Sequence, residues 1–534
     1  MTRILFIVIV SYIFSVTINL MSQQPIEEWV ARYSGSTGYE QVINDVKTDN
    51  SGNTYITGYV WLNNQFNSRN GITIKINSSG NLSWFNIYNS FSNLADEFNA
   101  LTVDKLGNCY VTGFSDSSGY LTIKYNQNGD TVWTRSYNST FGPNSAKDIA
   151  VDSIGNVYIT GSFYQSNSFT DFATIKYDPS GNQQWVLYYN GLADRNDFAK
   201  HLVIDKNNEI IVSGNSQRDN TIDDVISIKY NSGGTVLWTK KYSGINNQGA
   251  TNINNLISDD SNNIYFSCSA LNNDRKIIKY DSMGDSVQIT SISDSIYSFT
   301  FYLGLLNNLC LVGTVPSQSI RTDCYTGMYN SSGSMIWSQR FAGNSFLSDD
   351  AGKNIAVDRD GNIYSVGYMD SNRIAYDFLS IKYDKNGNLI WYMRYSLSTF
   401  TDDKAYFIGL DTLKNIYVTG ISGGQIATIK YSQPPIGVVH IGSEIPLKYE
   451  LLQNCPNPFN PSTEIEFDLP QNTLVDLRVY NAVGQVVAEL VSKEYKTAGS
   501  YSVSFDGTNL ASGIYFYSIE AGTYKDVKKM VLIK

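Results

Sequence analysis

The sequence predicts an all-β protein, an eight-bladed β-propeller closed by an N-terminal strand and followed by a small C-terminal β-sandwich. The first observation is a strand–turn–strand phrase that recurs eight times, about every 50 residues, for example at Val103–Gly113 and Val151–Gly161. The second is a tryptophan strand that is missing after the last copy. The third is a different alternating pattern that begins after Tyr431. Repeats of about 50 residues with four short strands each are typical of propellers.

Composition narrows the classes of function. The 534 residues carry 39 basic and 49 acidic side chains, and the net charge of −10 disfavours a nucleic-acid-binding surface. Only two His are present, which disfavours His-based metal sites and Ser-His-Asp catalysis. Five scattered Cys without C-x-x-C spacing predict neither a disulfide framework nor a zinc site. No cofactor is predicted from composition, and pairing of Cys310 with Cys324 stays open.

The N-terminus, residues 1–22, has the pattern of a secretory signal peptide. Arg3 supplies the positive start, Ile4–Leu20 is almost wholly apolar, and a polar run begins at Ser22. We place cleavage near Ser22. The alternative is a transmembrane anchor, since the apolar run is of borderline length for a span. No other segment of the sequence is apolar enough to cross a membrane, so we expect no span after signal removal.

Each unit of the propeller, expected over residues 23–432, has four strands. In the third unit the first three are Asp148–Asp152, Val157–Gly161 and Ala173–Tyr177, and the fourth surrounds Trp185. Asp, Gly and Asn recur in the turns because a tight turn needs a positive φ and an Asp side chain can accept nearby backbone N–H groups. We therefore interpret these residues as structural, with metal ligation as the alternative.

One Trp stands at a fixed phase in the fourth strand of most units. Such a row invites a sugar-binding interpretation, but one Trp per unit is better explained by packing between neighbouring blades. The eighth unit lacks its fourth strand, whereas Trp29–Gly35 repeats the pattern of Trp133–Tyr137 and Trp238–Gly244. We therefore predict that residues 27–35 complete the last blade, which leaves no open sheet edge.

The C-terminal region is predicted to be a separate unit. A linker is expected at residues 433–448 and a β-sandwich at residues 449–534. The sandwich opens with the Pro/Asn-rich segment Asn454–Thr463, which cannot be helical. Six alternating strands are then expected: Glu464–Leu469, Val475–Asn481, Gln485–Val491, Gly499–Phe505, Gly513–Glu520 and Lys529–Ile533.

Two sets of residues are candidates for ligand contact. The position eight residues before each turn Asp is polar in every unit, and in four units it is an Asp: Asp96, Asp197, Asp350 and Asp403. A ring of these carboxylates near the channel mouth makes calcium a candidate ligand. The favoured alternative is that each Asp caps the loop before its strand by accepting backbone N–H bonds. Trp61, the one Trp outside the blade phase, is the best single candidate for ligand contact, with loop packing as its alternative.

Two stretches of the sequence resemble known protein families. The phrase I-A-V-D-x-x-G-N-x-Y-[VIS]-[TV]-G, at Ile149–Gly161 and Ile355–Gly367, resembles the bacterial β-propeller repeat family of the SBBP type. That family is often called seven-bladed, whereas this chain has eight units between Glu28 and Tyr431.

The C-terminal residues resemble the type A C-terminal sorting domain of the type IX secretion system. The motif positions are Asn454, Pro456, Asn457, Pro458, Phe459, Asn460, Pro461, Gly484, Gly513, Lys528 and Lys529. The resemblance implies the type IX machinery as a partner. It implies export through the periplasm to the extracellular space or the outer-membrane surface.

Two classes of function remain. The one that we favour is a secreted or surface-bound scaffold for binding or adhesion to a glycan, a peptide or a protein. The other is a secreted propeller enzyme that is similar to polysaccharide lyases, glycosidases or quinoproteins. No catalytic residue is singled out, because Asp is too common in the turns for a catalytic pair to be recognised. Fold alone does not decide between these classes.

Overall fold

The structure is a computed structural model that describes most of the chain. The described residues are 24–34, 41–61, 69–90, 95–116, 119–139, 142, 144–165, 169–219, 222–244, 249–270, 275–292, 296–317, 321–343, 349–370, 375–433, 439–440, 446–507 and 510–533. The signal peptide expected at residues 1–22 lies outside them. The described residues are almost entirely β-structure, with one short 3₁₀ turn, η2 (Leu305–Asn307). None of the described helices is long and apolar enough to cross a membrane.

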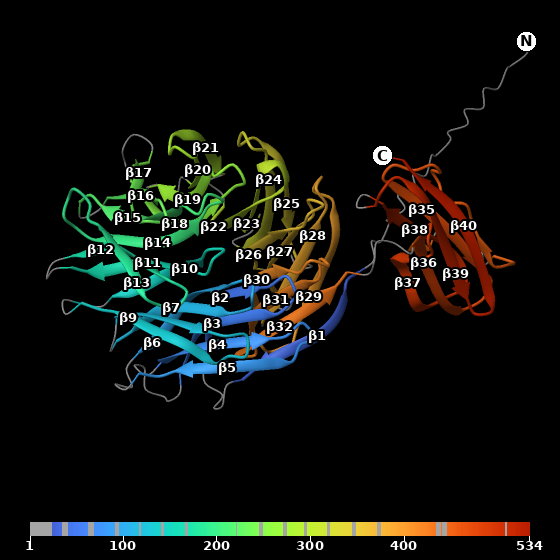
Figure 1. The fold of residues 1–534 in the computed structure, drawn as a ribbon, viewed down its shortest axis with the longest axis horizontal. Helices are drawn as coiled ribbons and strands as arrows, with labels where there is room; N and C mark the ends of the chain where they lie inside the picture. The colour runs from blue at the N-terminus through green and yellow to red at the C-terminus, as the bar shows by residue number, and fades with distance from the viewer. Residues whose placement is uncertain are drawn as a thin grey trace, which may run out of the picture.

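Residues 26–432 form four-stranded antiparallel sheets (Figure 1). In the described part of the chain, seven of these sheets follow chain order: β2 (Gln41–Thr48), β3 (Thr54–Trp61), β4 (Arg69–Ile76), β5 (Leu82–Tyr88); β6 (Asp96–Val103), β7 (Cys109–Ser115), β8 (Gly119–Tyr125), β9 (Thr131–Tyr137); β10 (Ser145–Val151), β11 (Val157–Tyr164), β12 (Thr170–Tyr177), β13 (Gln183–Tyr189); β14 (Asp197–Ile204), β15 (Ile210–Gln217), β16 (Asp223–Tyr230), β17 (Val236–Tyr242); β18 (Ala250–Ser258), β19 (Ile264–Ala270), β20 (Arg275–Tyr280), β21 (Ser286–Ile292); β22 (Ser298–Leu303), β23 (Leu309–Pro316), β24 (Thr322–Tyr329), β25 (Met335–Phe341); β26 (Asp350–Val357), β27 (Ile363–Asp370), β28 (Tyr376–Tyr383), β29 (Leu389–Tyr395).

The remaining sheet of this region has the strand order β1-β32-β31-β30. Its members are β1 (Ile26–Tyr33), β30 (Asp403–Leu410), β31 (Ile416–Ser422) and β32 (Gln425–Ser432). β1 pairs antiparallel with β32, with Trp29 opposite Lys430 and Tyr33 opposite Ile426. Figure 1 shows the blue β1 beside the orange β32. Strands from the two ends of the region therefore share one sheet.

One edge strand of each sheet, called the inner strand here, contacts the inner strand of the next sheet; in the sheet that contains β1 it is β30. These contacts run from β2 through β6, β10, β14, β18, β22 and β26 to β30, and β30 in turn contacts β2. The hydrophobic core lies between successive sheets, where for example Trp133 and Tyr110 pack with Ile149 and Ile175.

The turns are built as the sequence predicts. Asp104 Oδ1 accepts the N–H groups of Leu106 and Asn108 at 2.9 and 3.0 Å. Its Oδ2 accepts the side-chain amide of Asn108 at 2.8 Å and the Tyr110 hydroxyl at 3.0 Å. Gly107, at φ 79°, supplies the positive φ that the turn needs. The same Asp bonds recur at Asp49, Asp152 and Asp411. The structural interpretation of these residues is confirmed.

The Trp side chains connect neighbouring sheets. Trp133 Nε1 donates to Pro179 O at 3.2 Å, across the boundary to the next sheet. A Cβ on Gly181 in that turn would lie 2.8 Å from the Trp133 ring, so only Gly lets the turn approach the indole. Trp29 of β1 makes the same contact with the sheet of β2–β5, donating to Ser78 O at 3.2 Å beneath Gly80. Packing between sheets is therefore confirmed.

The C-terminal region is a β-sandwich of two sheets, ordered β33-β38-β35-β34 and β37-β36-β39-β40. The strands are β33 (Val439–His440), β34 (Glu450–Leu451), β35 (Ser462–Leu469), β36 (Thr473–Asn481), β37 (Val486–Lys496), β38 (Gly499–Asp506), β39 (Gly513–Ala521) and β40 (Tyr524–Leu532). Their inward-facing side chains form one core that includes Phe467, Val479 and Tyr517. β33 falls within the segment expected as linker and pairs with β38. β40 begins earlier than expected because Tyr524–Lys528 continues the pairing with β39.

Candidate functional site

The inner strands share an irregularity that selects one residue in each. In six of them the register with the second strand shifts by one residue, which leaves that residue unpaired as a β-bulge. The bulged residues are Asn44, Asn99, Lys147, Lys200, Lys353 and Tyr406. Bulges re-aim a side chain and are frequent beside binding sites.

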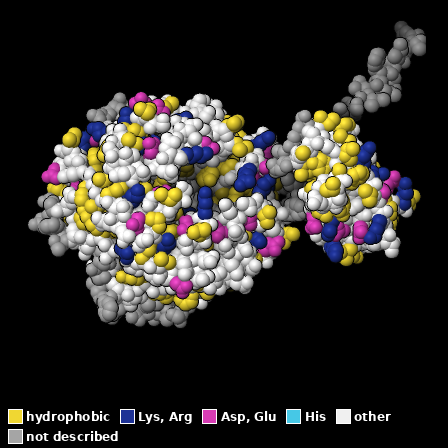
Figure 2. All heavy atoms as spheres, in the orientation of Figure 1, with side chains coloured by type: hydrophobic (Ala, Val, Ile, Leu, Met, Phe, Trp, Pro, Cys, Tyr) yellow, Lys and Arg dark blue, Asp and Glu magenta, His cyan; other side chains and the backbone are white. Residues whose placement is uncertain are grey.

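Four bulged residues from successive sheets line one hollow. The hollow has a volume of about 440 Å³ and is lined by Asn44, Asn99, Lys147, Ser162, Phe198, Ala199, Lys200 and His201. Figure 2 shows Lys and Arg side chains beside a hollow in the face of the propeller region. The lining thus combines cationic, amide and aromatic groups, and we take it as the candidate site.

Lys147 and Lys200 are contacted by no acidic side chain among the described residues. Within the described residues, neither ammonium group has a hydrogen-bond or ion-pair partner. By contrast, Lys124 and Lys176 donate to backbone carbonyls of the next sheet, Pro179 O at 3.3 Å and Ser232 O at 2.7 Å. Desolvation by the surrounding protein lowers the pKa of Lys147 and of Lys200.

The two bulged Asn side chains are oriented by the neighbouring strand. Asn44 Nδ2 donates to Phe98 O at 2.8 Å, and Asn99 Nδ2 donates to Ala146 O at 2.7 Å. Each amide nitrogen is therefore engaged between sheets, and each side-chain carbonyl oxygen is the group that the Asn can offer to a ligand.

His201 is held as a neutral imidazole in the wall of the hollow. Burial lowers its pKa to about 4. Its Nδ1 lies 3.8 Å from Asp148 Oδ2. Burial raises the pKa of the Asp148 carboxyl to about 7, although this carboxylate accepts the N–H groups of Leu202 and Ile149 at 2.8 Å each. The hollow therefore presents one neutral imidazole beside its two lysines at neutral pH.

The four Asp residues of the expected carboxylate ring each bind their own loop. An Oδ2 atom accepts a loop N–H at 2.6 Å in Asp96, Asp197 and Asp350, and at 2.7 Å in Asp403. All four side chains are fully buried. In the part of the chain that the structure describes, no three His, Cys, Asp or Glu side chains lie close enough to hold a metal ion. These bonds are the ones that the capping interpretation predicts, and calcium binding stays a prediction.

We expect each of these carboxylates to stabilise the fold without metal. Replacing Asp197 with Ala leaves the Gly191 N–H without its acceptor, so the free energy of unfolding should fall by about 1–3 kcal/mol. A chelator should leave the melting temperature of the parent protein unchanged. Asp260→Ala serves as the control, because Asp260 is an exposed partner of Lys206 and such pairs contribute little. A chelator that lowers the parent's melting temperature by several degrees would contradict capping and support calcium.

Trp61 lies at the end of β3, outside the hollow. Its ring packs edge-on against Tyr59, with the ring centroids 4.9 Å apart. The Arg69 guanidinium lies 5.1 Å from the Tyr59 ring and forms an ion pair with Glu97 at 3.2 Å. The loop that follows, residues 62–68, lies outside the described residues, and ligand contact by Trp61 stays a prediction.

The sorting-motif residues hold the opening segment of the sandwich against its last strand. Asn457 Nδ2 donates to Lys529 O at 3.3 Å, and its Oδ1 accepts the Val531 N–H at 3.0 Å. Phe459 is buried; its N–H donates to Val531 O of β40, and its carbonyl oxygen accepts the N–H of Ile533 just beyond β40. Asn454 is buried and donates to Pro456 O at 3.1 Å. The motif therefore ties together segments that are about 70 residues apart in the chain.

The other motif positions lie at turns and on the surface. Gly484, at φ 82°, closes the β36–β37 turn, and Gly513 begins β39. Pro461 O accepts the Gly507 N–H at 2.8 Å, and Lys528 lies 4.0 Å from Asp526. Pro456, Pro458 and Asn460 lie in the same opening segment.

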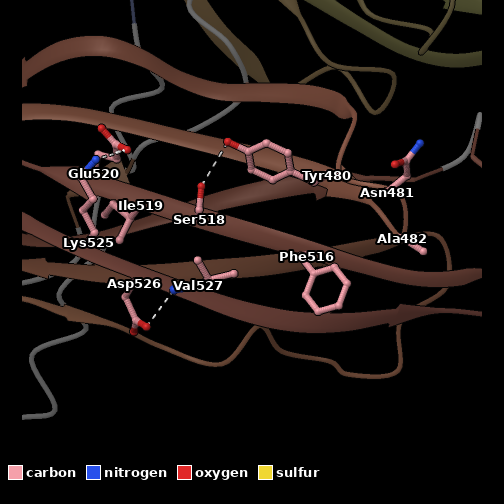
Figure 3. A pocket seen from close by; sticks show the side chains of 11 residues that line it. Tyr480, Asn481, Ala482, Phe516, Ser518, Ile519, Glu520, Lys525, Asp526 and Val527 are labelled. Carbon is pink, nitrogen blue, oxygen red and sulfur yellow. Dashed lines mark hydrogen bonds and ion pairs between the residues drawn. The ribbon is translucent and has the colours of Figure 1, made fainter.

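A second hollow, of about 560 Å³, lies on the outer face of the sandwich over β36, β39 and β40. Figure 3 shows Tyr480, Phe516 and Val527 along it, with the Ser518 hydroxyl donating to the Tyr480 hydroxyl at 3.4 Å. A Lys525–Glu520 ion pair of 2.6 Å lies at its edge. This surface contains no residue of the expected ligand set of the propeller.

The propeller region and the C-terminal region each match a known protein family. Residues 336–374 match the β-propeller repeat of the SBBP type, and residues 455–534 match the secretion system C-terminal sorting domain. The chain therefore carries a β-propeller repeat and a type IX sorting domain, which confirms both resemblances. The sorting domain implies interaction with the type IX machinery and export to the extracellular space or the outer-membrane cell surface.

Solved structures show only distant likeness. One is a protein of unknown function from Bacteroides caccae, with 12% identity and a TM-score of 0.31, over 53% of this chain and 93% of that chain. A gluconolactonase from Xanthomonas campestris has 10% identity and a TM-score of 0.29, over 62% and 97%. An ulvan lyase has 9% identity and a TM-score of 0.37, over 73% and 94%. Similarity this low transfers no function. No curated protein sequence matches the chain.

The lining of the candidate site was not found by the sequence reasoning. Counting eight residues back from the turn Asp selects the loop-capping carboxylates. Counting five back selects the bulged residues, as in Lys147 before Asp152 and Lys200 before Asp205. The signal in the sequence is a polar or cationic residue at this fixed position of successive units, Asn44, Asn99, Lys147 and Lys200.

Proposed function

We propose that residues 26–432 form a closed propeller of eight blades that binds an extracellular ligand at the cell surface or outside the cell. Closure is supported by the pairing of β1 with β32 and by the contact of β30 with β2. It is also supported by Trp29, which bonds the sheet of β2–β5 as other Trp side chains bond their neighbours. Such a ring is a rigid platform for a site on its inner strands.

The observation that carries the binding function is the hollow lined by bulged residues of four successive inner strands. A concave site that combines an apolar wall with a few oriented polar groups is typical of ligand recognition. Lys200 is half-buried and desolvation lowers its pKa, a cost that a bound anion would offset.

A second candidate is an enzyme on the same scaffold, and one observation favours it. His201 lines the hollow as a neutral imidazole, which is the form that accepts a proton. A lyase that removes a proton from a sugar would need such a base.

The test is a glycan and peptide array with the mature chain, followed by mass spectrometry of every bound compound. We expect binding that leaves the ligand intact. Release of a shortened or unsaturated product would support the enzyme instead, and His201→Ala should then abolish that product without abolishing binding. If the array shows neither binding nor product, the proposed function is wrong.

A further inference from the structure

The charge in the hollow is opposite to the charge of the chain as a whole. The protein has a net charge of −10, yet Lys147 and Lys200 stand in one hollow without a contacting anion among the described residues. Two ammonium groups that line one concave place make it electropositive, and an anion bound there would form charge-assisted hydrogen bonds with them.

The acidic groups near the hollow do not cancel this charge. Glu97 lies near Lys147 but is engaged in an ion pair with Arg69 at 3.2 Å. Asp223 acts on Lys200 from a distance. Asp148 is held by two backbone N–H groups, and His201 is neutral. The hollow therefore attracts an anion, and a lysine ammonium group, as a compact point charge, can pair with a carboxylate.

The remaining lining fits the rest of a sugar ring. The side-chain nitrogens of Asn44 and Asn99 donate to backbone carbonyls on the inner strand of the neighbouring sheet. Their side-chain oxygens can therefore accept hydrogen bonds from the hydroxyl groups of a sugar. Phe198 is 39% exposed although it lies on an inner strand, and it lines the same hollow. An exposed aromatic ring in a polar site offers an apolar surface for the C–H face of a sugar.

From these groups we infer that the hollow binds an acidic sugar, the carboxylate-bearing unit of an anionic polysaccharide. Lys147 and Lys200 hold the carboxylate, Asn44 and Asn99 accept hydroxyl groups, and Phe198 packs against the ring. The bulged Lys353 lies outside the hollow on β26, beyond the inner strands β18 and β22, and provides a further cation for a polymer with repeated carboxylates. This inference rests on the proposed binding function and adds the chemistry of the ligand.

The experiment is a calorimetric titration of the mature chain with oligomers of galacturonate, mannuronate and glucuronate. The matched ligand for each is the same oligomer with its carboxyl groups reduced to alcohols. We expect at least one acidic oligomer to bind, and its reduced form to bind at least about tenfold more weakly, since a hydrogen bond to a charged group is lost. Binding should weaken as salt is raised.

The variants Lys147→Met and Lys200→Met test the site itself. Each keeps the apolar stem and removes the charge, so each should weaken binding roughly ten- to hundredfold. Lys147→Arg should retain much of the affinity. Lys105→Met is the control, because Lys105 is an exposed lysine on the turn at the end of β6. Unchanged melting temperatures would show that the variants are folded.

The outcomes separate this inference from the proposed function. Equal binding of acidic and reduced oligomers, or full affinity in both Met variants, would overturn the acidic-sugar inference and leave a binding protein. Binding of inorganic sulfate or of sulfated oligomers alone would also overturn it. An absence of binding to any glycan or peptide would overturn both.

Discussion

Deletion of residues 23–35 should lower the melting temperature by several degrees or more and make the protein prone to aggregate. The deletion removes β1, which pairs with β32 from Ile26 to Tyr33. It leaves β32 as a sheet edge with unpaired backbone groups, and such edges recruit other chains.

The side chains of β1 add to the loss. Trp29 bonds Ser78 O and packs near Tyr417, with the ring centroids 6.0 Å apart. Tyr33 is buried and packs 5.3 Å from Phe85, again between centroids. Removing one such buried aromatic side chain costs about 3–5 kcal/mol, a large part of the stability of a domain. Because the Trp29–Ser78 bond and the Tyr33–Phe85 contact join the sheet of β1 to the sheet of β2–β5, their loss opens the proposed ring.

Two controls distinguish closure from a local defect. Trp84→Ala removes the same kind of contact between two interior sheets, where Trp84 bonds Gln127 O at 3.1 Å. It should cost less than the deletion, since it leaves every strand paired. A synthetic peptide of residues 24–34 should restore the melting temperature of the truncated protein by pairing with β32. An unchanged melting curve after deletion would refute the closed ring.

The repeat made much of the fold predictable from sequence. The Asp–Gly–Asn turns and the packing of the Trp side chains can be predicted because the same local structure recurs from unit to unit. Each turn needs a positive φ, and each indole packs beside a Gly. The matching Trp29 segment suggested a partner for the last sheet, and β1 indeed pairs with β32. A pattern that recurs from unit to unit is stronger evidence for the fold than the hydrophobic pattern of any one strand.

The site was less predictable because it depends on register. A bulge at Lys147 moves the following residues by one place relative to the second strand. The alternating pattern alone does not state where that shift occurs. Reasoning from the sequence therefore chose Asp197 and its equivalents, whose carboxylates are buried against loop N–H groups. The hollow requires four sheets to be brought together, which no one repeat encodes.

Removal of residues 446–534 should change where the protein goes and leave the propeller folded. We expect the truncated chain to accumulate in the periplasm, whereas the parent should reach the medium or the outer surface. Fusing residues 446–534 to a periplasmic reporter should export the reporter. Cell fractionation with immunoblotting measures both, and a periplasmic marker controls for leakage.

Point variants ask whether export needs the folded sandwich. Phe459 is 2% exposed, and its ring centroid lies 5.9 Å from that of Phe505. Phe459→Ala should therefore cost about 3–5 kcal/mol, enough to unfold a domain of this size. Asn457→Ala removes the two bonds to Lys529 O and Val531 N and should weaken export to a smaller extent.

Tyr495→Ala is the matched control, because Tyr495 is 68% exposed and its loss opens no cavity. We expect this variant to be exported like the parent. If Phe459→Ala is exported at the parent level, or if the truncated chain still reaches the surface, then the sandwich is not the export signal. Asn457 and Phe459 reach the last strand only when both sheets have formed. We therefore expect export to depend on the folded sandwich, which holds the motif residues in place.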